Sequence, residues 1–430
     1  MNEYLQLALN VARSSGASYT DIRIIANQNQ IISVKNGEID SVNNSNSLGF
    51  GIRVIANGSW GFASSSSLTK PEVKKIAARA VEVAKASATL RKDSVRLAPE
   101  PVYNDIWTSP YLIDPFKVSL EDKLELLFKV DKILRENSKI KISRASMSFW
   151  REHQWFANSE GSNIEQIFLR SGCASSATAV EGSEVQVRSY PEAHGGQNAQ
   201  MGYELINSLD LPGHAAQIRE EAVALLSAPD CPVADKDIII GGGQLALQIH
   251  ESIGHPSELD RVLGMEANYA GRSFITTDLY HDYHYGSSIV NVVADSTVPT
   301  GLATFGYDDD GVRAQRYHII QDGLYKMYLT NRELAHVVGE NRSRGCNRAD
   351  GFGNIPMIRM INISLMPGKG SLKDLISDTK DGIYLENNKT WSIDQRRLNF
   401  QFTAEIGWEI KNGKKVRMVK NPTYQGITPT

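Results

Sequence analysis

Hydrophobic and polar residues follow a helical spacing at the start of the chain and a strand spacing soon after it. Apolar residues between positions 5 and 12 recur every three or four residues, and Gly16 follows them, which predicts a short amphipathic helix. Two strand-like runs then end at Asn36-Gly37 and Asn57-Gly58, residue pairs that favour tight hairpin turns. The pattern over residues 21–64 therefore predicts an antiparallel sheet.

Capping signals and further strand-like runs continue this mixture to about residue 228. Thr69-Lys70-Pro71-Glu72 has the spacing of a capping box with an early proline, and Ser119 begins another helix that has leucines along one side. Short strand-like runs over 139–189 are separated at Ser159-Glu160-Gly161 and at Glu181-Gly182, which indicates a meander. A helix is predicted over 214–226, and the proline-containing residues 228–232 are typical of a linker.

Strand-like patterns dominate the chain after this linker. Residues 237–240 are predicted to form a buried strand that leads through three glycines into a helix carrying His250. Further strands are predicted at 290–293, 317–320, 325–329, 357–365, 398–406 and 416–419, with turns at Gly323, Gly382 and Gly413. We therefore predict an α+β fold with two domains. The first, over 1–228, is a mixed antiparallel sheet with helices, and the second, over 235–430, is β-rich and carries the helix of His250.

Composition and charge narrow the class of protein. The chain of 430 residues has 41% hydrophobic and 22% charged residues, as in an ordinary globular protein. Its formal net charge of −3 gives no overall field that would attract nucleic acid or anionic lipid. Three scattered cysteines argue against a disulfide framework, and no signal peptide or apolar membrane span is visible. We predict a cytoplasmic protein without nucleic-acid or membrane partners.

Candidate chemistry is concentrated between Gln248 and Asp260, where two histidines flank a glutamate. Neutral imidazole is a good zinc ligand, and a carboxylate beside a metal can move a proton. His250 and His255 are five residues apart, which places them about 140° apart on an ideal α-helix. Both can reach one metal ion only if the helix widens into a π-turn or ends near Gly254. The alternative is an amphipathic helix whose histidines are merely polar.

Four other segments are weaker candidates. His281-Asp282-Tyr283-His284 could bind a metal, but a polar turn is the preferred interpretation. Asp308-Asp309-Asp310-Gly311 lacks the spacing of a calcium loop and is interpreted as an acidic turn. Cys346 is the most ligand-like cysteine, although a free thiol is preferred, and the turn-like residues 347–351 could contact substrate.

Several segments together resemble the TldD/PmbA family of metallopeptidases. The resemblance begins with HESIGHPSELDR at 250–261, which contains both histidines and Glu251. It extends to VKNGE at 34–38, GFGIRV at 49–54, FGYDDDGVRAQ at 305–315, PMIRMIN at 356–362 and NPTYQGITP at 421–429. The segments are spread over nearly the whole chain.

This resemblance implies a function and a set of roles. The TldD-like member of the family carries the histidine motif and its PmbA (TldE) sister lacks it, so the chain resembles the catalytic member. His250 and His255 would bind Zn²⁺, and Glu251 would be the general base. The expected function is a zinc-dependent peptidase that cleaves unfolded or unstructured peptides. It would act with a TldE/PmbA-like partner subunit or as a homodimer.

One part of the family pattern is missing from the sequence. The family's third zinc ligand is a cysteine in a segment beyond NPTYxGxTP, and this sequence ends at Thr430. The chain could be truncated, use another ligand, or bind metal weakly. The alternative functions are a metal-free, non-catalytic partner subunit of the same family and a hydrolase of other amides or esters.

Overall fold

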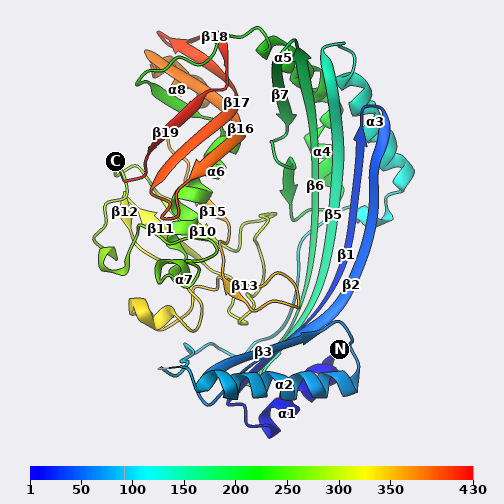
Figure 1. The fold of residues 1–430 in the computed structure, drawn as a ribbon, viewed down its shortest axis with the longest axis vertical. Helices are drawn as coiled ribbons and strands as arrows, with labels where there is room; N and C mark the ends of the chain where they lie inside the picture. The colour runs from blue at the N-terminus through cyan, green and yellow to red at the C-terminus, as the bar shows by residue number, and fades with distance from the viewer. Residues whose placement is uncertain (92, 430) are drawn as a thin grey trace.

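The computed structural model describes residues 1–91 and 93–429, and one long curved sheet organises its N-terminal half (Figure 1). Within the described residues the sheet has eight strands in the order β3-β2-β1-β5-β6-β4, with β7 and β8 also paired to β6. The strands are β1 (Tyr19–Lys35), β2 (Glu38–Ala56), β3 (Ser59–Ser65), β4 (Asn104–Thr108), β5 (Ile140–Asn158), β6 (Asn163–Glu181), β7 (Glu184–Tyr190) and β8 (Gln197–Ala199).

The predicted hairpins account for the regularity of this sheet. Asn36 and Gly37 have positive φ values of 51° and 85°, and they join β1 to β2 in antiparallel register. Left-handed backbone at both central positions suits the twist of the flanking strands. The predicted turns near Gly161 and Gly182 likewise separate β5, β6 and β7. The runs predicted as short strands are in fact two strands of 19 residues, β5 and β6.

The helices of this half cover a single face of the sheet. They are α1 (Asn2–Ser14), α2 (Lys70–Ala88), α3 (Leu120–Leu134), α4 (Glu204–Leu209) and α5 (Leu211–Leu225). Ile22 and Ile24 of β1 pack with α1 and α2, and Ile32 and Val34 pack with α3 and α5. These are even-numbered residues, so they point to the same face of the strand. The odd-numbered face is left for the C-terminal half, which lies on the inner side of the curved strands (Figure 1).

Three smaller sheets form the C-terminal half. In the described residues their strand orders are β18-β17-β16-β9 with β19 on β17, β12-β11-β10-β15, and β13-β14. The strands are β9 (Asp237–Ile240), β10 (Val292–Asp295), β11 (Arg316–Gln321), β12 (Leu324–Tyr325), β13 (Asn347–Arg348), β14 (Met357–Ile358), β15 (Ile363–Leu365), β16 (Asp381–Ile393), β17 (Asn399–Lys411), β18 (Lys414–Lys420) and β19 (Thr423–Ile427). The helices are α6 (Gly242–Ile249), α7 (Leu259–Val262) and α8 (Leu372–Asp378). The predicted α+β class is confirmed.

Several local predictions in this half are wrong. Gly382 lies inside β16, paired to β9, where a Cβ atom would come within 2.8 Å of the Asp237 carbonyl oxygen. Close backbone approach, and not a turn, therefore explains this glycine. Strand β16 escaped prediction because it contains asparagines that disfavour strands. Asn387 has a φ of 55°, and the register shifts between Asn388 and Thr390. Strand β9 is only half-buried, not buried as predicted.

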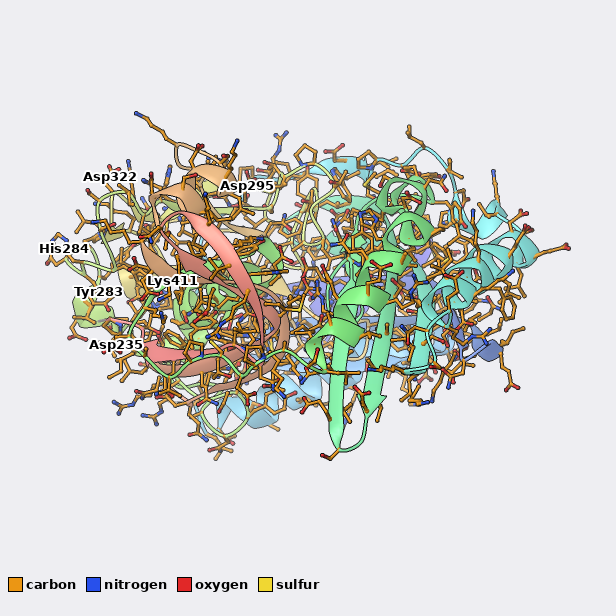
Figure 2. All side chains as sticks on the ribbon, turned by 90° about the horizontal axis from the view of Figure 1, so that it is seen from above. Asp235, Tyr283, His284, Asp295, Asp322 and Lys411 are labelled. Carbon is orange, nitrogen blue, oxygen red and sulfur yellow. The ribbon has the colours of Figure 1, made fainter. Side chains whose placement is uncertain are left out.

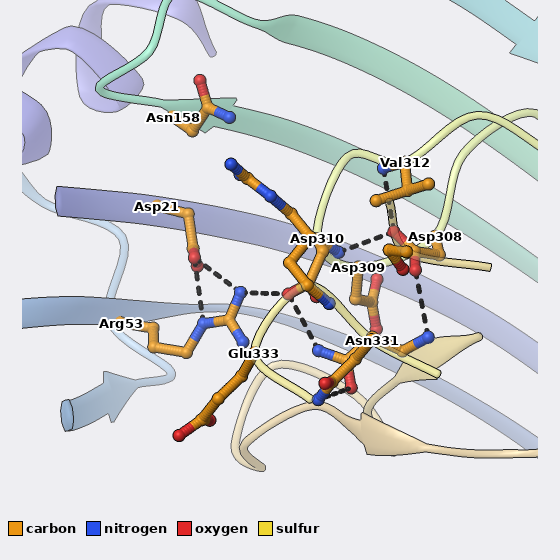
Figure 3. Close-up of polar contacts among 12 residues, drawn as sticks. Asp21, Arg53, Asn158, Asp308, Asp309, Asp310, Val312, Asn331 and Glu333 are labelled. Carbon is orange, nitrogen blue, oxygen red and sulfur yellow. Dashed lines mark hydrogen bonds and ion pairs between the residues drawn. The ribbon is translucent and has the colours of Figure 1, made fainter. Parts of the chain in front are cut away.

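A buried ion-pair cluster joins the two halves of the molecule (Figure 3). Arg53 of β2 donates to Asp21 Oδ2 at 2.7 Å and to Asp310 Oδ1 at 2.6 Å. Arg23 of β1 contacts Asp309 at 3.1 Å. The acidic turn at 308–311 is therefore buried against the long sheet, and its aspartates are the C-terminal half's counter-ions for two buried arginines. The division into domains 1–228 and 235–430 stays a prediction.

Candidate metal centre

The helix that carries the histidines widens where the first histidine lies. Helix α6 continues as a π-turn over His250–Gly254, and a short 3-10 turn follows over His255–Ser257. The His255 N–H donates to the His250 carbonyl, five residues earlier, which is the hydrogen bond that defines a π-turn. The two imidazole rings consequently lie 4.5 Å apart between centroids, with planes 81° apart. Of the two geometries that would let both histidines reach one metal ion, the structure has the π-turn.

Two hydroxyl groups, one distant and one in the following turn, donate hydrogen bonds to carbonyl groups of the π-turn. Tyr285 donates its hydroxyl to the Ser252 carbonyl at 2.7 Å, and Ser257 donates to the Ile253 carbonyl at 2.6 Å. Met360 packs closely on Gly254, because a Cβ atom there would come within 2.0 Å of the Met360 sulfur. A π-turn is uncommon and costs regular hydrogen bonds, so these contacts stabilise it.

Among the described residues, His250, Glu251 and His255 form a group that could hold a metal ion, with possible ligand atoms within 4.8 Å of one another. His250 faces the cavity described below. Burial of its ring, followed by the charge of His255, lowers the pKa of His250 to about 4. The ring is therefore neutral at neutral pH, the form in which imidazole binds a metal.

Glu258 orients His255. Its Oε2 accepts a hydrogen bond from His255 Nδ1 at 2.8 Å and another from Arg261 Nε at 2.9 Å. Burial alone would raise the pKa of Glu258, but the bond from His255 and the charges of His255, Arg261 and Arg359 outweigh it, and the pKa is lowered. A carboxylate on Nδ1 directs Nε2 toward the other donors, the usual arrangement around a histidine ligand.

Glu251 is buried and faces a cation from the C-terminal sheet. Its Oε2 lies 3.5 Å from Arg397 Nε, and it has no hydrogen-bond partner among the described residues. Arg397 belongs to the hairpin between β16 and β17 and has a φ of 64°. It is held there by donating to the carbonyls of Ala270 and Asp394. Arg397 is therefore the counter-ion of the buried Glu251 carboxylate.

Tyr424 supports the helix that precedes the π-turn, a role that sequence reasoning missed. Its hydroxyl donates to Gln248 Oε1 and accepts from Gln244 Nε2, both at 3.1 Å. Both glutamines lie within one turn of each other on the same side of α6. The NPTYQG segment of β19 therefore braces the metal helix from the opposite sheet. The one available signal was the four-residue spacing of the two glutamines.

The group opens into a cavity of about 1180 Å³ between the long sheet and the C-terminal half. One wall consists of odd-numbered residues of β1, which share one face of the sheet, and of residues of β5 and β6. Examples are Asn29, Trp150 and Arg170. The other wall contains His250, His255 and residues 347–351. The histidine motif and the 347–351 turn, far apart in sequence, therefore line one space.

The remaining candidates lie elsewhere. Cys346 is buried in an apolar cluster, its sulfur is 3.0 Å from the Tyr317 hydroxyl, and burial raises its pKa to about 12. A thiol so hard to ionise is a poor ligand. His284 is exposed at the end of the molecule farthest from the long sheet, near Tyr283 and Asp322 (Figure 2). His281 is likewise exposed, as the preferred interpretation of a polar turn implied.

Comparison with known families agrees with this geometry. The models of the PmbA/TldA metallopeptidase domains match this chain at residues 20–84 (domain 1), 113–226 (central domain) and 237–430 (C-terminal domain). The chain belongs to the PmbA/TldD metallopeptidase family. The predicted resemblance is confirmed, and membership in a metallopeptidase family implies a metal.

Curated relatives and solved structures are similar over nearly the whole chain. A metalloprotease of Methanocaldococcus jannaschii is 29% identical over 95% of this chain and 86% of its own length. A zinc metalloprotease TldD homolog of Saccharolobus solfataricus is 25% identical over 97% of this chain and 88% of its own. The structure of TldE from Thermococcus kodakarensis has a TM-score of 0.73 at 18% identity and covers 99% of this chain and 91% of its own. That likeness shows the fold.

The donor set of this PmbA/TldD chain is compatible with a metal ion such as zinc. It offers a neutral imidazole at His250, an imidazole oriented by Glu258 at His255, and the unpartnered carboxylate oxygen of Glu251. Nitrogen and oxygen donors of this kind suit zinc. Separately, no helix in the described part of the chain is long and apolar enough to cross a membrane.

Proposed function

We propose that this chain is a zinc-dependent peptidase that cleaves unfolded or unstructured peptides, the catalytic TldD-like subunit of a two-subunit protease. The observation that carries this proposal is the group of His250, Glu251 and His255 at the wall of a cavity of about 1180 Å³. A cavity of that size accommodates several residues of an extended peptide but no folded domain. The name of the Saccharolobus solfataricus relative supports zinc.

Each residue of the group has a distinct role in this proposal. His250 and His255 hold the metal through ring nitrogens. Zinc, when bound, is a Lewis acid that polarises the scissile carbonyl and lowers the pKa of water. Glu251 accepts the proton of the attacking water and delivers it to the leaving amine. Arg397, with its Nε 3.5 Å from Glu251 Oε2, holds this carboxylate in position.

Two imidazoles are fewer than the three protein ligands usual at catalytic zinc. The group within the described residues contains no cysteine. The affinity for zinc is therefore the property that most directly tests the proposal.

The deciding experiment is elemental analysis of the zinc-loaded chain after dialysis. We expect roughly one zinc per chain, which is lost in His250→Ala. The matched control is His284→Ala, because His284 is exposed and far from the group. Absence of metal in the wild type, or retention of metal in His250→Ala, contradicts the proposal. Cleavage of an unfolded protein, with and without a candidate partner, then tests the peptidase activity.

An open sheet edge supports a partner subunit. Residues 38–48 of β2 are all exposed, and β3 pairs with β2 only over residues 50–56. Ile39, Val42 and Leu48 add exposed apolar area there. Long uncharged edges pair readily with other strands, and segment 41–48 has no charge and no proline. A TldE/PmbA-like subunit or a second copy of this chain would cover this edge.

A metal-free, non-catalytic subunit is the second candidate function, and the likeness to the TldE structure favours it. Wild-type protein that assembles with a partner but holds no zinc would support this candidate. We also propose that the protein is cytoplasmic. The three free cysteines support a reducing environment.

A further inference from the structure

The cavity contains an arginine for which the described residues provide no hydrogen-bond acceptor. Arg170 of β6 lines the cavity, and its guanidinium carbon lies 3.9 Å from the centre of the Trp150 ring on β5. Trp150 is its direct partner in the sheet register. The guanidinium makes no hydrogen bond in the described residues, and its buried Nε is unsatisfied. Buried polar atoms are normally paired, so the unsatisfied Nε leaves this guanidinium with a donor for an external acceptor.

A second unpaired arginine approaches from the opposite wall. Arg348 lies in β13, within the turn of residues 347–351, and it also lines the cavity without a hydrogen bond or ion pair in the described residues. Burial is the largest influence on Arg170 and lowers its pKa; the charge of Glu152 opposes this, and the charge of Arg348 lowers the pKa further. Like charges facing each other across a cavity repel, and the Glu152 carboxyl group, on which both guanidinium charges act, offsets this repulsion only when it is ionised.

The carboxylates that line the cavity do not form ion pairs with these two arginines among the described residues. Glu152 lies two residues from Trp150 on the same face of β5, yet it is not within ion-pair distance of either arginine. Asp309 is already paired to Arg23, and Asp350 is on an exposed loop. A half-buried carboxyl group can take a proton, whereas guanidinium keeps its charge at neutral pH. Both guanidinium groups are therefore left without an ion-pair partner among the described residues.

We propose that Arg170 and Arg348 form a carboxylate-binding subsite that anchors peptide substrates in the cavity. Trp150 holds the Arg170 guanidinium flat, and a planar guanidinium suits two-pronged binding of a carboxylate. The carboxylate is either the peptide's C-terminal group or an aspartate or glutamate side chain. This inference rests on the proposed peptidase function for the nature of the ligand, but not for its test.

The location of Arg170 connects this subsite to the metal group. Phe168, two residues earlier on the same strand face, packs in one apolar cluster with Ile249 and Ile253, which flank His250. The guanidinium of Arg170 lies 5.6 Å from the Phe168 ring. An anchored carboxylate would therefore place the neighbouring peptide bonds alongside the histidines, so the subsite decides where a peptide is cut.

The test measures binding to metal-free protein, so that a carboxylate cannot bind through zinc. Fluorescence anisotropy would compare three versions of one labelled, unfolded peptide without internal acidic residues. The versions are a free C-terminus, an amidated C-terminus, and an amidated C-terminus with one added glutamate. We expect one carboxylate-bearing version to bind about tenfold or more tightly than the plain amide. Which version does so identifies the C-terminus or the side chain as the source.

The variants connect the preference to the two arginines. In Arg170→Gln and in Arg348→Gln the preference for a carboxylate should fall to about twofold or less, because each loses a charged donor. Arg348→Gln changes an exposed side chain that has no hydrogen bond or ion pair among the described residues, so folding should be little affected. Arg144→Gln is the control: Arg144 is exposed on β5, outside the cavity, and should leave the preference unchanged.

Equal affinity of the wild type for all three peptides overturns the inference, as does a preference that survives in both cavity variants. Loss of the preference in Arg144→Gln also overturns it, because the effect would then be one of general charge. Failure of the proposed function would instead appear as wild type that cleaves none of the peptides when loaded with zinc, whatever the binding preference.

Discussion

The two walls of the cavity differ in what holds their side chains in place. The sheet wall consists of long strands in regular register, where each side chain's direction follows from its position in the alternation. The wall with the metal group is an irregular turn, braced by Tyr285, Met360 and Tyr424 from distant segments. A change on the regular wall should alter binding or stability locally. A change on the irregular wall should alter the geometry of the metal group.

The largest expected effect is on the irregular wall, at Glu251. Glu251→Gln should reduce kcat by about 10²–10⁴-fold, because an amide cannot accept the proton of water. Zinc content should stay that of the wild type, since the histidines are untouched. Steady-state kinetics and elemental analysis on the same preparation check both. Loss of zinc in this variant would contradict a role limited to proton transfer.

A large effect on stability is expected where the two halves meet. Arg53→Ala leaves Asp21 and Asp310 buried without their cation, which should reduce the free energy of unfolding by about 3–5 kcal/mol. Urea denaturation followed by fluorescence measures it. Arg79→Ala is the matched control: Arg79 pairs with Glu82 on the surface of α2, and that change should be barely measurable. Similar losses in both variants would argue against the buried cluster as the join.

A smaller effect is expected from the carboxylate that orients His255. Glu258→Gln removes the charge that accepts the His255 Nδ1 hydrogen bond, and zinc affinity should fall by about 10–100-fold. Competition with a chromophoric chelator gives this affinity. A normal affinity in Glu258→Gln would mean that the π-turn alone orients the ring.

A smaller effect on stability and zinc binding is expected from the hydrogen bonds between Tyr424 of β19 and helix α6. Tyr424→Phe removes the hydroxyl that links Gln244 and Gln248, a loss of about 0.5–1.5 kcal/mol per hydrogen bond. We expect a slightly lower melting temperature and severalfold weaker zinc binding. Phe402→Leu, in the ring cluster around Tyr424 but without a polar contact to α6, distinguishes loss of packing from loss of the brace. Weaker zinc binding in Phe402→Leu but not in Tyr424→Phe would contradict the role of the hydroxyl.

The smallest effect is expected on the regular wall, at Glu152. Burial, opposed in part by Arg170, raises the pKa of Glu152 to about 7. Its protonated form is therefore favoured by folding. The stabilising contribution is full below the unfolded pKa of about 4.5 and is lost as pH rises through about 7. Glu152→Gln should match the wild type at pH 4 and melt slightly higher at pH 8. Melting curves at both pH values check it, and equal curves at pH 8 contradict it.

The N-terminal sheet could be predicted because its signals are local. Asn36-Gly37 specifies a turn that joins two neighbouring strands, and Ser119 caps α3 through its own side chain. Strand β16 could not be predicted in the same way. Its partner β9 is far away in sequence, and a glycine and asparagines interrupt its apolar pattern.

For the candidate metal group, too, the residues close together in sequence could be predicted and the distant ones could not. His250, Glu251 and His255 are sequence neighbours, so the residue types and the need for a π-turn could be read from the chain alone. The bracing by Tyr424, the counter-ion Arg397 and the opposing Arg170 could not, because each comes from an element that only long-range sheet pairing brings to the cavity.

The amino-acid sequence by itself determined the family, the α+β class, the hairpins and the three neighbouring residues of the metal group. Tertiary structure alone decided that the acidic turn at 308–311 is a buried join and that Cys346 is shielded from any metal. It also decided that Arg170 and Arg348 share one cavity. The physical reason is the sequence separation over which each kind of interaction acts. Turns, caps and periodicity act over a few residues, whereas burial and charge pairing depend on segments up to hundreds of residues apart.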